Sequence, residues 1–201
     1  MRKTDHWRPA LTLLLTVLGV HHLFGAGLIK ARAHVAPVLI SRAWEQSLER
    51  AGAPVKPWPW ADTWPVARLQ VPSQAIDLPV LAGDTGNALA FAPGYSLASA
   101  PLGSEGLAVI GGHRDTHFAF LSQVQTGDLL QLQIQDGSWR NYEVVGADVV
   151  DVRSSALPTG PFAETLLLVT CYPFDSLDSR GPLRYVVAAI PTLTEGNLTH
   201  F

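Results

Sequence analysis

Seven short segments rich in β-branched residues follow one another in the last two-thirds of the chain. They are VARLQV, AIDLPVL, GLAVIGG, DLLQLQIQ, WRNYEVVGADVVDV, ETLLLVT and PLRYVVAAI. Glycine, proline, aspartate and asparagine separate them, so turns rather than long helices join the segments. This spacing predicts a mainly β domain that starts near Val66, an antiparallel barrel or sandwich. One or two helical turns are expected in THFAFLSQV, after the third segment.

Composition limits the class of protein further. The 201 residues suit one globular domain plus an extra hydrophobic element. A formal net charge of −3 lacks the basic surface that phosphate binding needs, so nucleic acid is not an expected partner. The single cysteine, Cys171, excludes an intramolecular disulfide, a CxxC redox pair and a thiolate zinc cluster. Cys171 is therefore either a structural thiol or a reactive one.

Residues 11–29 form a run of nineteen residues without a charge. A helix of this length can span the hydrocarbon core of a bilayer, which is about 30 Å thick. A cleaved signal peptide is the alternative, although its apolar part is usually shorter, about 7–15 residues. We expect an uncleaved transmembrane anchor. The basic residues on its two sides are nearly balanced, so they do not set its orientation.

The segment that follows the anchor has a helical pattern. Residues 38–50 place Leu39, Ala43 and Leu48 near one face, with charged residues elsewhere. This pattern predicts a short amphipathic helix, which we interpret as a stalk.

A segment rich in proline and tryptophan precedes the first predicted strand. Residues 53–65 contain four prolines, which forbid a regular helix or a central strand. They also contain Trp58, Trp60 and Trp64. One interpretation is a plain linker. The other, which we favour, is a linker whose tryptophans pack against the folded domain, because exposed tryptophans on a free tether would be a liability.

Cys171 follows the predicted strand ETLLLVT and precedes YPFDS, whose proline and aspartate start a loop. A cysteine at the end of a strand can be held rigidly and still face solvent, as a nucleophile must. Free cysteine is also among the most buried and inert residue types. The sequence around Cys171 alone leaves both roles open.

His113 also lies just past a predicted strand, in LAVIGGHRDTHF. Gly111 and Gly112 before it allow the backbone bend or close approach that would present an imidazole beside a cleft. Histidine can exchange protons near neutral pH, and an imidazolium near a thiol stabilises the thiolate. His117 is the alternative candidate for proton transfer. Its spacing from His113, HxxxH, also occurs in zinc sites, although no third ligand is evident. Asp115 either orients an imidazole or caps the following turn, and capping is the expected role.

Arg184 lies inside the predicted strand PLRYVVAAI, between apolar residues. A guanidinium held on a strand near a thiol can donate hydrogen bonds to the oxyanion of a tetrahedral intermediate. The alternative is an ordinary arginine on a strand face, in a salt bridge. Arg180, in the loop DSRGP, competes for the oxyanion role, but a mobile loop positions a charge less well.

The order of His113, Cys171 and Arg184 along the chain, and the motifs around them, resemble those of the sortase family. The motifs are GGHRDTHF, LLLVTCYP and PLRYVV. The resemblance implies a sortase-like eight-stranded β-barrel with one or two short helices, preceded by an N-terminal transmembrane helix. It assigns His113, Cys171 and Arg184 as the catalytic set. The stretch PWPWADTWPVARLQVP also resembles the Gram-negative subgroup of the family, class GN.

With the resemblance, the chain divides into six expected parts. They are an N-terminal tail (1–10), a transmembrane anchor (11–30), a helical stalk (31–52), a linker rich in proline and tryptophan (53–65), a sortase catalytic domain (66–192) and a C-terminal tail (193–201).

The resemblance implies a cysteine transpeptidase. The thiolate of Cys171 would cleave a substrate protein's C-terminal LPxTG-like sorting signal between threonine and glycine, and an amine acceptor would release the thioacyl enzyme. The amine acceptor is unknown. No cofactor is expected, and no metal either, because the acidic calcium cluster of some members is not evident. The chain's own LPTG at 157–160 lacks the intervening residue, and we interpret it as chance loop composition.

The implied location is the cell membrane, with a single span and the catalytic domain outside the cytoplasm, on the periplasmic side in a Gram-negative cell. L,D-transpeptidases and papain-like hydrolases also use cysteine and histidine, but neither motif pattern fits this chain. A catalytically inactive anchored β-barrel that binds an envelope protein remains the alternative function.

Overall fold

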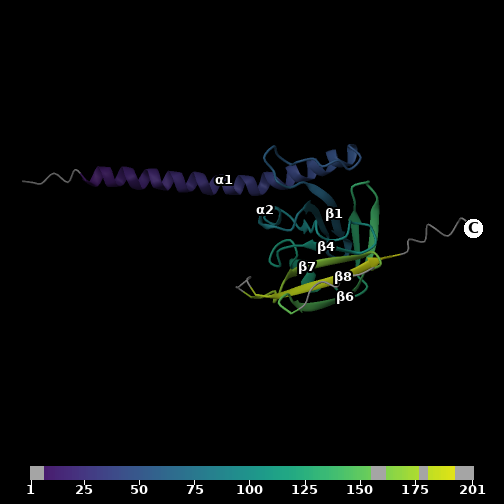
Figure 1. Cartoon of the computed structure of the whole chain (residues 1–201). Coiled ribbons are helices and arrows are strands. Elements are labelled where there is room, and N and C mark those ends of the chain that lie inside the picture. Colours follow the sequence, from purple (N-terminus) through teal and green to yellow (C-terminus); the bar gives the residue numbers. More distant parts are fainter. Residues whose placement is uncertain (1–6, 155–161, 177–180, 193–201) are drawn as a thin grey trace, which may run out of the picture. The chain divides into compact units, whose positions relative to one another are not determined.

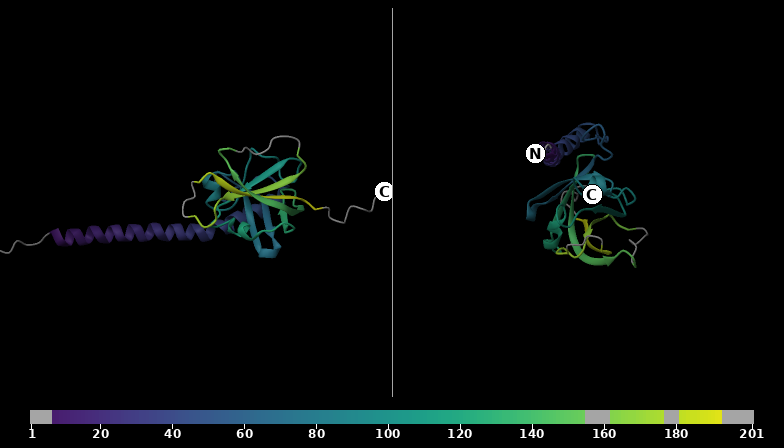
Figure 2. Two further views of the ribbon diagram at one scale, coloured as in Figure 1. Left: turned by 90° about the horizontal axis from the view of Figure 1, so that it is seen from below. Right: turned by 90° about the vertical axis from the view of Figure 1, so that its left-hand side faces the viewer.

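A closed β-barrel forms the C-terminal part of the chain (Figures 1 and 2). The computed structural model describes residues 7–154, 162–176 and 181–192. Within them, the strands are β1 (Pro65–Val71), β2 (Ile76–Ala82), β3 (Gly94–Tyr95), β4 (Leu107–Gly111), β5 (Leu129–Gln133), β6 (Trp139–Asp151), β7 (Thr165–Cys171) and β8 (Leu183–Pro191). Their neighbour order around the barrel is β1-β2-β3-β4-β7-β8-β6-β5. This confirms the predicted mainly β fold with an eight-stranded barrel.

All seven segments predicted from the sequence are strands in the structure. The eighth strand, β3, has only two residues, too few for a periodic pattern to predict it. The expectation of antiparallel pairing was wrong for two pairs, because β2 with β3 and β4 with β7 are parallel. β4 and β7 can run in the same direction because the antiparallel pair β5 and β6 lies between them in the chain.

Within the part of the chain that the structure describes, three short helical elements accompany the barrel. They are the 3₁₀ helix η1 (Pro72–Gln74), the α-helix α2 (Gly86–Leu89) and the 3₁₀ helix η2 (Ala119–Gln123). η2 confirms the helical turns predicted in THFAFLSQV. α2 was not predicted, because one helical turn is too short to show apolar periodicity.

The two faces of β7 have different roles. Leu166, Leu168 and Thr170 are buried, and both leucines belong to the barrel's hydrophobic core. Side chains alternate along a strand, so Val169 and Cys171 lie on the opposite, outer face. The core thus fixes the direction in which the side chain of Cys171 points.

Helix α1 runs from Trp7 to Glu49. The chain divides into two compact units, Met1–Val38 and Leu39–Phe201, and the last turns of α1 belong to the second. In that unit Ile40 is fully buried and packs with Leu81, Ala88 and Ala92 of the barrel domain. The predicted amphipathic helix is therefore confirmed.

The predicted buried face of that helix was only partly right. Ala43 is buried as expected, but Ile40, Trp44 and Ser47 complete the face instead of Leu39 and Leu48. The Trp44 indole N–H donates to Oε1 of Gln133 in β5 at 3.2 Å. These last turns are thus part of the folded domain rather than a separate stalk.

We expect Ile40→Ala to lower the free energy of unfolding by about 2–4 kcal/mol, because it removes a fully buried side chain and leaves a cavity. Urea titration followed by tryptophan fluorescence measures this change. Gln46→Ala, at an exposed position of the same helix, is the control and should change it by less than about 0.5 kcal/mol. Equal effects of both substitutions would show that α1 is not anchored through Ile40.

The three linker tryptophans behave differently. Trp58 packs edge-to-face on Phe91, with ring centroids 5.3 Å apart, and Trp64 packs against the barrel core. Both confirm the predicted packing. The prediction was wrong for Trp60, which is 83% exposed. It lies in a turn directly after Pro59, where its side chain faces solvent.

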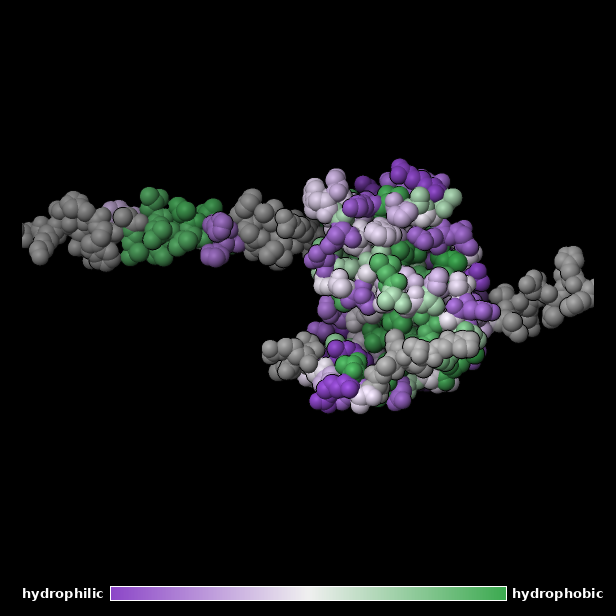
Figure 3. All heavy atoms as spheres, viewed as in Figure 1, coloured by the Kyte–Doolittle hydropathy of each residue, from purple (hydrophilic) through white to green (hydrophobic). Residues whose placement is uncertain are grey.

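The first unit contains the predicted anchor. Residues 11–23 of α1 expose their apolar side chains, among them Leu13, Leu15 and Leu23 at 66%, 59% and 75% (Figure 3). The side chains of residues 24–34 are outside the described set. Within the described residues, no helix combines the length and the apolar character that a membrane span requires. The helix predicted over residues 11–29 is confirmed, and its insertion in a membrane stays a prediction.

Candidate active site

The three residues that the sequence singled out lie on or beside three neighbouring strands, β4, β7 and β8 (Figure 1). Cys171 ends β7 and is partly exposed on its outer face. In the antiparallel pair of β7 and β8, Cys171 is directly opposite Arg184. Residues paired in this way point to the same face, with Cβ atoms about 5 Å apart. The backbone register thus starts the side chains of Arg184 and Cys171 from neighbouring positions on the same face of the barrel.

One nitrogen of the Arg184 guanidinium makes all of its hydrogen bonds within the described residues. Its Nη1 donates to the carbonyl oxygens of Gly181 and Leu183, at 2.7 and 2.9 Å. Within the described residues, Nε and Nη2 have no hydrogen-bond partner. One nitrogen therefore orients the side chain, and the other N–H groups remain able to donate to an oxyanion.

His113 follows β4 by two residues. The parallel register pairs Gly111 with Val169, and the Gly112 amide continues it with a bond to the Val169 carbonyl at 3.1 Å. The Thr170 hydroxyl donates to the Gly112 carbonyl at 2.7 Å. These bonds bring the exposed His113 to the end of β7 at which Cys171 lies. No hydrogen bond joins the two side chains within the described residues, and such bonds often tighten only when substrate binds.

Gly112 is required by close packing. A Cβ atom at this position would lie 2.7 Å from the ring of Phe118, which is fully buried. The Phe118 amide also donates to the His113 carbonyl at 2.9 Å, which closes the turn after β4. The close approach predicted for this glycine pair is thus confirmed at Gly112.

His117 lies beside His113, with ring centroids 6.5 Å apart and an angle of 29° between the rings. Burial, and next the charge of His113, hold the pKa of His117 below its ordinary value, although a backbone hydrogen bond with Phe91 acts in the opposite direction. Nδ1 of His117 is buried without a partner within the described residues. No group of three or more potential metal ligands occurs within the described residues. We therefore place His117 as a neutral neighbour of His113.

A lowered pKa at His117 has a consequence for stability. The unfolded chain binds a proton at this residue more readily than the folded chain does. The contribution of His117 to the free energy of unfolding is therefore present above pH 6.5 and is lost as the pH falls below it. From pH 7.5 to pH 5, we expect the unfolding free energy of the wild type to fall relative to that of His117→Asn. Urea titrations at several pH values test this. A difference that stays constant would contradict the assignment.

Three lesser candidates have different outcomes. The predicted capping role of Asp115 was wrong, because η2 begins after Phe118 and has no side-chain cap. Asp115 is exposed instead. Arg180 and the LPTG at 157–160 lie outside the described residues.

The sequence did not single out Arg114. It is only 5% exposed, and it donates to the backbone carbonyls of Pro173 and Ser176 in the loop after Cys171. In the same loop, Tyr172 and Phe174 pack against Tyr185, the neighbour of Arg184, with ring centroids 6.2 and 5.2 Å from that of Tyr185. An arginine in a polar stretch predicts an exposed charge, so no local signal pointed to this contact.

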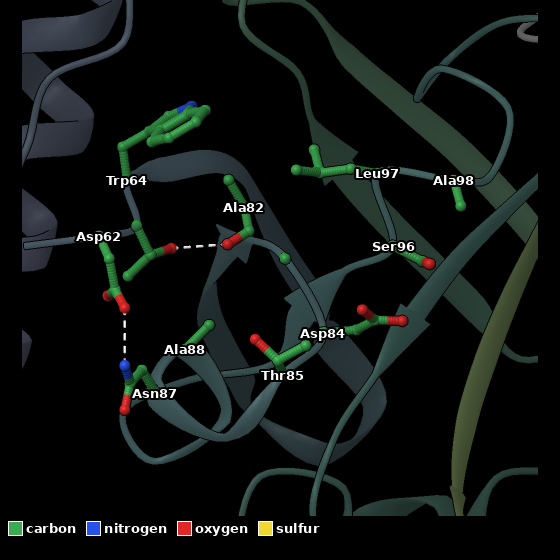
Figure 4. Close-up of a pocket in the computed structure, with 12 residues that line it drawn as sticks. Asp62, Trp64, Ala82, Asp84, Thr85, Asn87, Ala88, Ser96, Leu97 and Ala98 are labelled. Carbon is green, nitrogen blue, oxygen red and sulfur yellow. Dashed lines mark hydrogen bonds between the residues drawn. The ribbon is translucent and has the colours of Figure 1, made fainter.

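Two surface hollows lie away from these residues. One of about 400 Å³ is bordered by Asp62, Trp64, Asp84 and Asn87, where the Asn87 amide donates to Asp62 at 2.6 Å (Figure 4). The other, of about 410 Å³, shares Trp64 with it. Neither includes His113, Cys171 or Arg184 in its lining. We assign the candidate site from strand register rather than from the depth of a cavity.

A comparison with protein families matches residues 69–192 to the Sortase domain, which is more than half of the chain. The protein belongs to the sortase family. This confirms the resemblance carried by the three motifs. The narrower assignment to the Gram-negative subgroup is not tested by the comparison and stays a prediction.

A named relative agrees with the assignment to the sortase family. The sortase is 32% identical to Sortase D of Bacillus subtilis over 120 residues, which cover 59% of this chain and 60% of that relative. The match therefore spans less than two-thirds of that relative's length.

Solved structures share the fold. Sortase A from Corynebacterium diphtheriae superimposes with a TM-score of 0.60 at 20% identity, covering 88% of this sortase and 98% of that chain. The Clostridium perfringens Sortase D5 transpeptidase gives 0.60 at 17% identity, covering 79% and 99%.

Proposed function

We propose that this sortase is a cysteine transpeptidase whose nucleophile is Cys171. The observation that carries the proposal is the pairing of Cys171 with Arg184 across β7 and β8, with His113 tied to the same end of β7. In acyl transfer through a thioester, a thiol can act as the nucleophile, a guanidinium can stabilise the oxyanion and an imidazole can transfer the proton. Family membership supports the same chemistry.

In the first half of the reaction, the Cys171 thiolate attacks the carbonyl carbon of the scissile amide. The carbonyl oxygen becomes an oxyanion, which receives hydrogen bonds from Arg184. His113 gives a proton to the amine nitrogen as the carbon–nitrogen bond breaks, and a thioacyl enzyme remains. The solvent exposure of His113 suits it to this exchange.

In the second half, an amine acceptor attacks the thioester. His113 takes a proton from the acceptor nitrogen, the new amide bond forms, and Cys171 leaves as the thiolate. The proposed substrate is a protein with a C-terminal LPxTG-like sorting signal, cleaved between threonine and glycine. The acceptor is an amine at the cell envelope.

The proposal includes a membrane anchor in α1, with the catalytic domain outside the cytoplasm. It is supported by the exposed apolar side chains of residues 11–23. A helix that is apolar all round is expected in a membrane or a large core rather than in water. A reporter that is active only in the cytoplasm, fused after Phe201, tests the orientation. Activity of that reporter would contradict it.

The transpeptidase proposal is tested with the full-length protein in mild detergent. It is incubated with fluorescent peptides that carry LPxTG-type signals, varied at the third position, with and without a glycine-based amine. We expect a new product that contains the peptide up to threonine joined to the amine. Cleavage and transfer that are absent from the whole panel would contradict the proposed substrate class.

A further inference from the structure

Arg114 connects the two segments that carry His113 and Cys171. Its Nη1 donates to the Pro173 carbonyl at 2.7 Å, and its Nη2 donates to the Ser176 carbonyl. Pro173 and Ser176 are also joined by the Ser176 amide, at 3.5 Å from the Pro173 oxygen. The guanidinium thus bonds both ends of the turn that follows the nucleophile.

The contact is buried and geometrically demanding. Arg114 is 5% exposed, and a buried cation is stable only when its N–H groups have partners. Arginine presents its donors as a planar fork, which can bond two carbonyls in fixed directions. Lysine carries the same charge as a point and cannot reproduce that fork.

Both chain neighbours of His113, Gly112 and Arg114, make hydrogen bonds to residues near Cys171. On one side, Gly112 bonds Val169 and Thr170, the two residues before Cys171. On the other, Arg114 bonds the turn two to five residues after Cys171. Hydrogen bonds therefore join the residues before and after His113 to residues before and after Cys171.

We propose that Arg114 is a positioning residue, which fixes the His113 segment against the Cys171 segment so that the imidazole reaches the departing nitrogen. This inference rests on the proposed function of the site. Its buried guanidinium bonds the turn at Pro173–Ser176, so it acts through that turn rather than on the reacting atoms. A misplacement of a catalytic group by about 1 Å can cost about 100-fold in rate.

The proposal predicts a loss that depends on the leaving group. An amide needs a proton on the departing nitrogen, which His113 supplies. A peptide thioester with the same acyl part releases a thiolate, which departs without a proton. Displacing His113 should therefore slow acylation by the amide much more than acylation by the thioester.

The experiment compares wild type, Arg114→Lys and Arg114→Gln as full-length proteins in detergent, with circular dichroism to confirm folding. We expect single-turnover acylation by the amide to fall about 30- to 100-fold and that by the thioester less than about threefold. Arg68→Lys is the matched control, since Arg68 also uses two nitrogens, in a bond to Asp77 on the barrel surface. It should change neither rate.

Each other outcome has a definite meaning. Equal losses on both substrates, full activity of Arg114→Lys on the amide, or failure of both variants to fold would overturn the positioning role. A wild type that forms no thioacyl enzyme from either substrate would instead contradict the proposed function. The two failures are thus distinguishable.

Discussion

Cys171→Ala is expected to abolish acyl transfer, with a fall of more than about 1,000-fold in the rate of product formation. Alanine offers no nucleophile, and the remaining groups at the site bind and polarise a substrate without forming a thioester. The chain has no second cysteine that could substitute for it. Chromatography of the peptide products over time measures the rate.

The fold should tolerate this substitution. Cys171 is partly exposed on the outer face of β7 and lies outside the core cluster, so the free energy of unfolding should change by less than about 1 kcal/mol. Thr165→Ser, at the other end of the same face of β7, is the control and should keep its activity. A Cys171→Ala protein that retains a tenth of the wild-type rate would contradict the assignment of the nucleophile.

Arg184→Lys is expected to lower kcat by about 100- to 1,000-fold, with a smaller change in KM. The oxyanion forms only in the transition state, so loss of its donor acts mainly on kcat. Arginine bonds Gly181 and Leu183 through one nitrogen and keeps others for the oxyanion. A lysine ammonium has one nitrogen for both tasks.

Steady-state kinetics with the preferred peptide and a fixed amine test this prediction. Arg153→Lys is the control, because Arg153 is an exposed arginine that pairs with Asp151 on the barrel surface. It should leave both constants unchanged. If Arg184→Lys raises KM and leaves kcat intact, Arg184 binds the substrate in its ground state and is not the oxyanion donor.

Local pattern placed the candidate residues at strands or strand ends but left their roles open, and the resemblance of the three motifs to sortases assigned them as a catalytic set. Cys171 ends an apolar run, Arg184 lies inside one, and His113 follows one through a glycine pair. The side chain that packs on Gly112 could not be predicted, because the contact with Phe118 depends on the path of a turn. Strand ends are visible in a sequence, whereas their neighbours in space are not.

Strand order and long-range contacts account for most of what the sequence missed. The parallel pairing of β4 with β7 arises only when the barrel closes. The bond from Arg114 to Pro173 joins residues 59 positions apart. On α1, the helical period was clear, but two adjacent faces carry apolar residues, and only the fold selects the one with Ile40. Such features require the tertiary structure.

Intact-mass spectrometry of the full-length protein, incubated with an LPxTG-type peptide and no amine, tests the central claim most directly. We predict a mass gain equal to the peptide up to threonine, which is absent from Cys171→Ala and disappears from the wild type when a glycine-based amine is added. Peptide cleavage by Cys171→Ala at the wild-type rate, or an adduct that survives in Cys171→Ala, would contradict a thioacyl intermediate at Cys171.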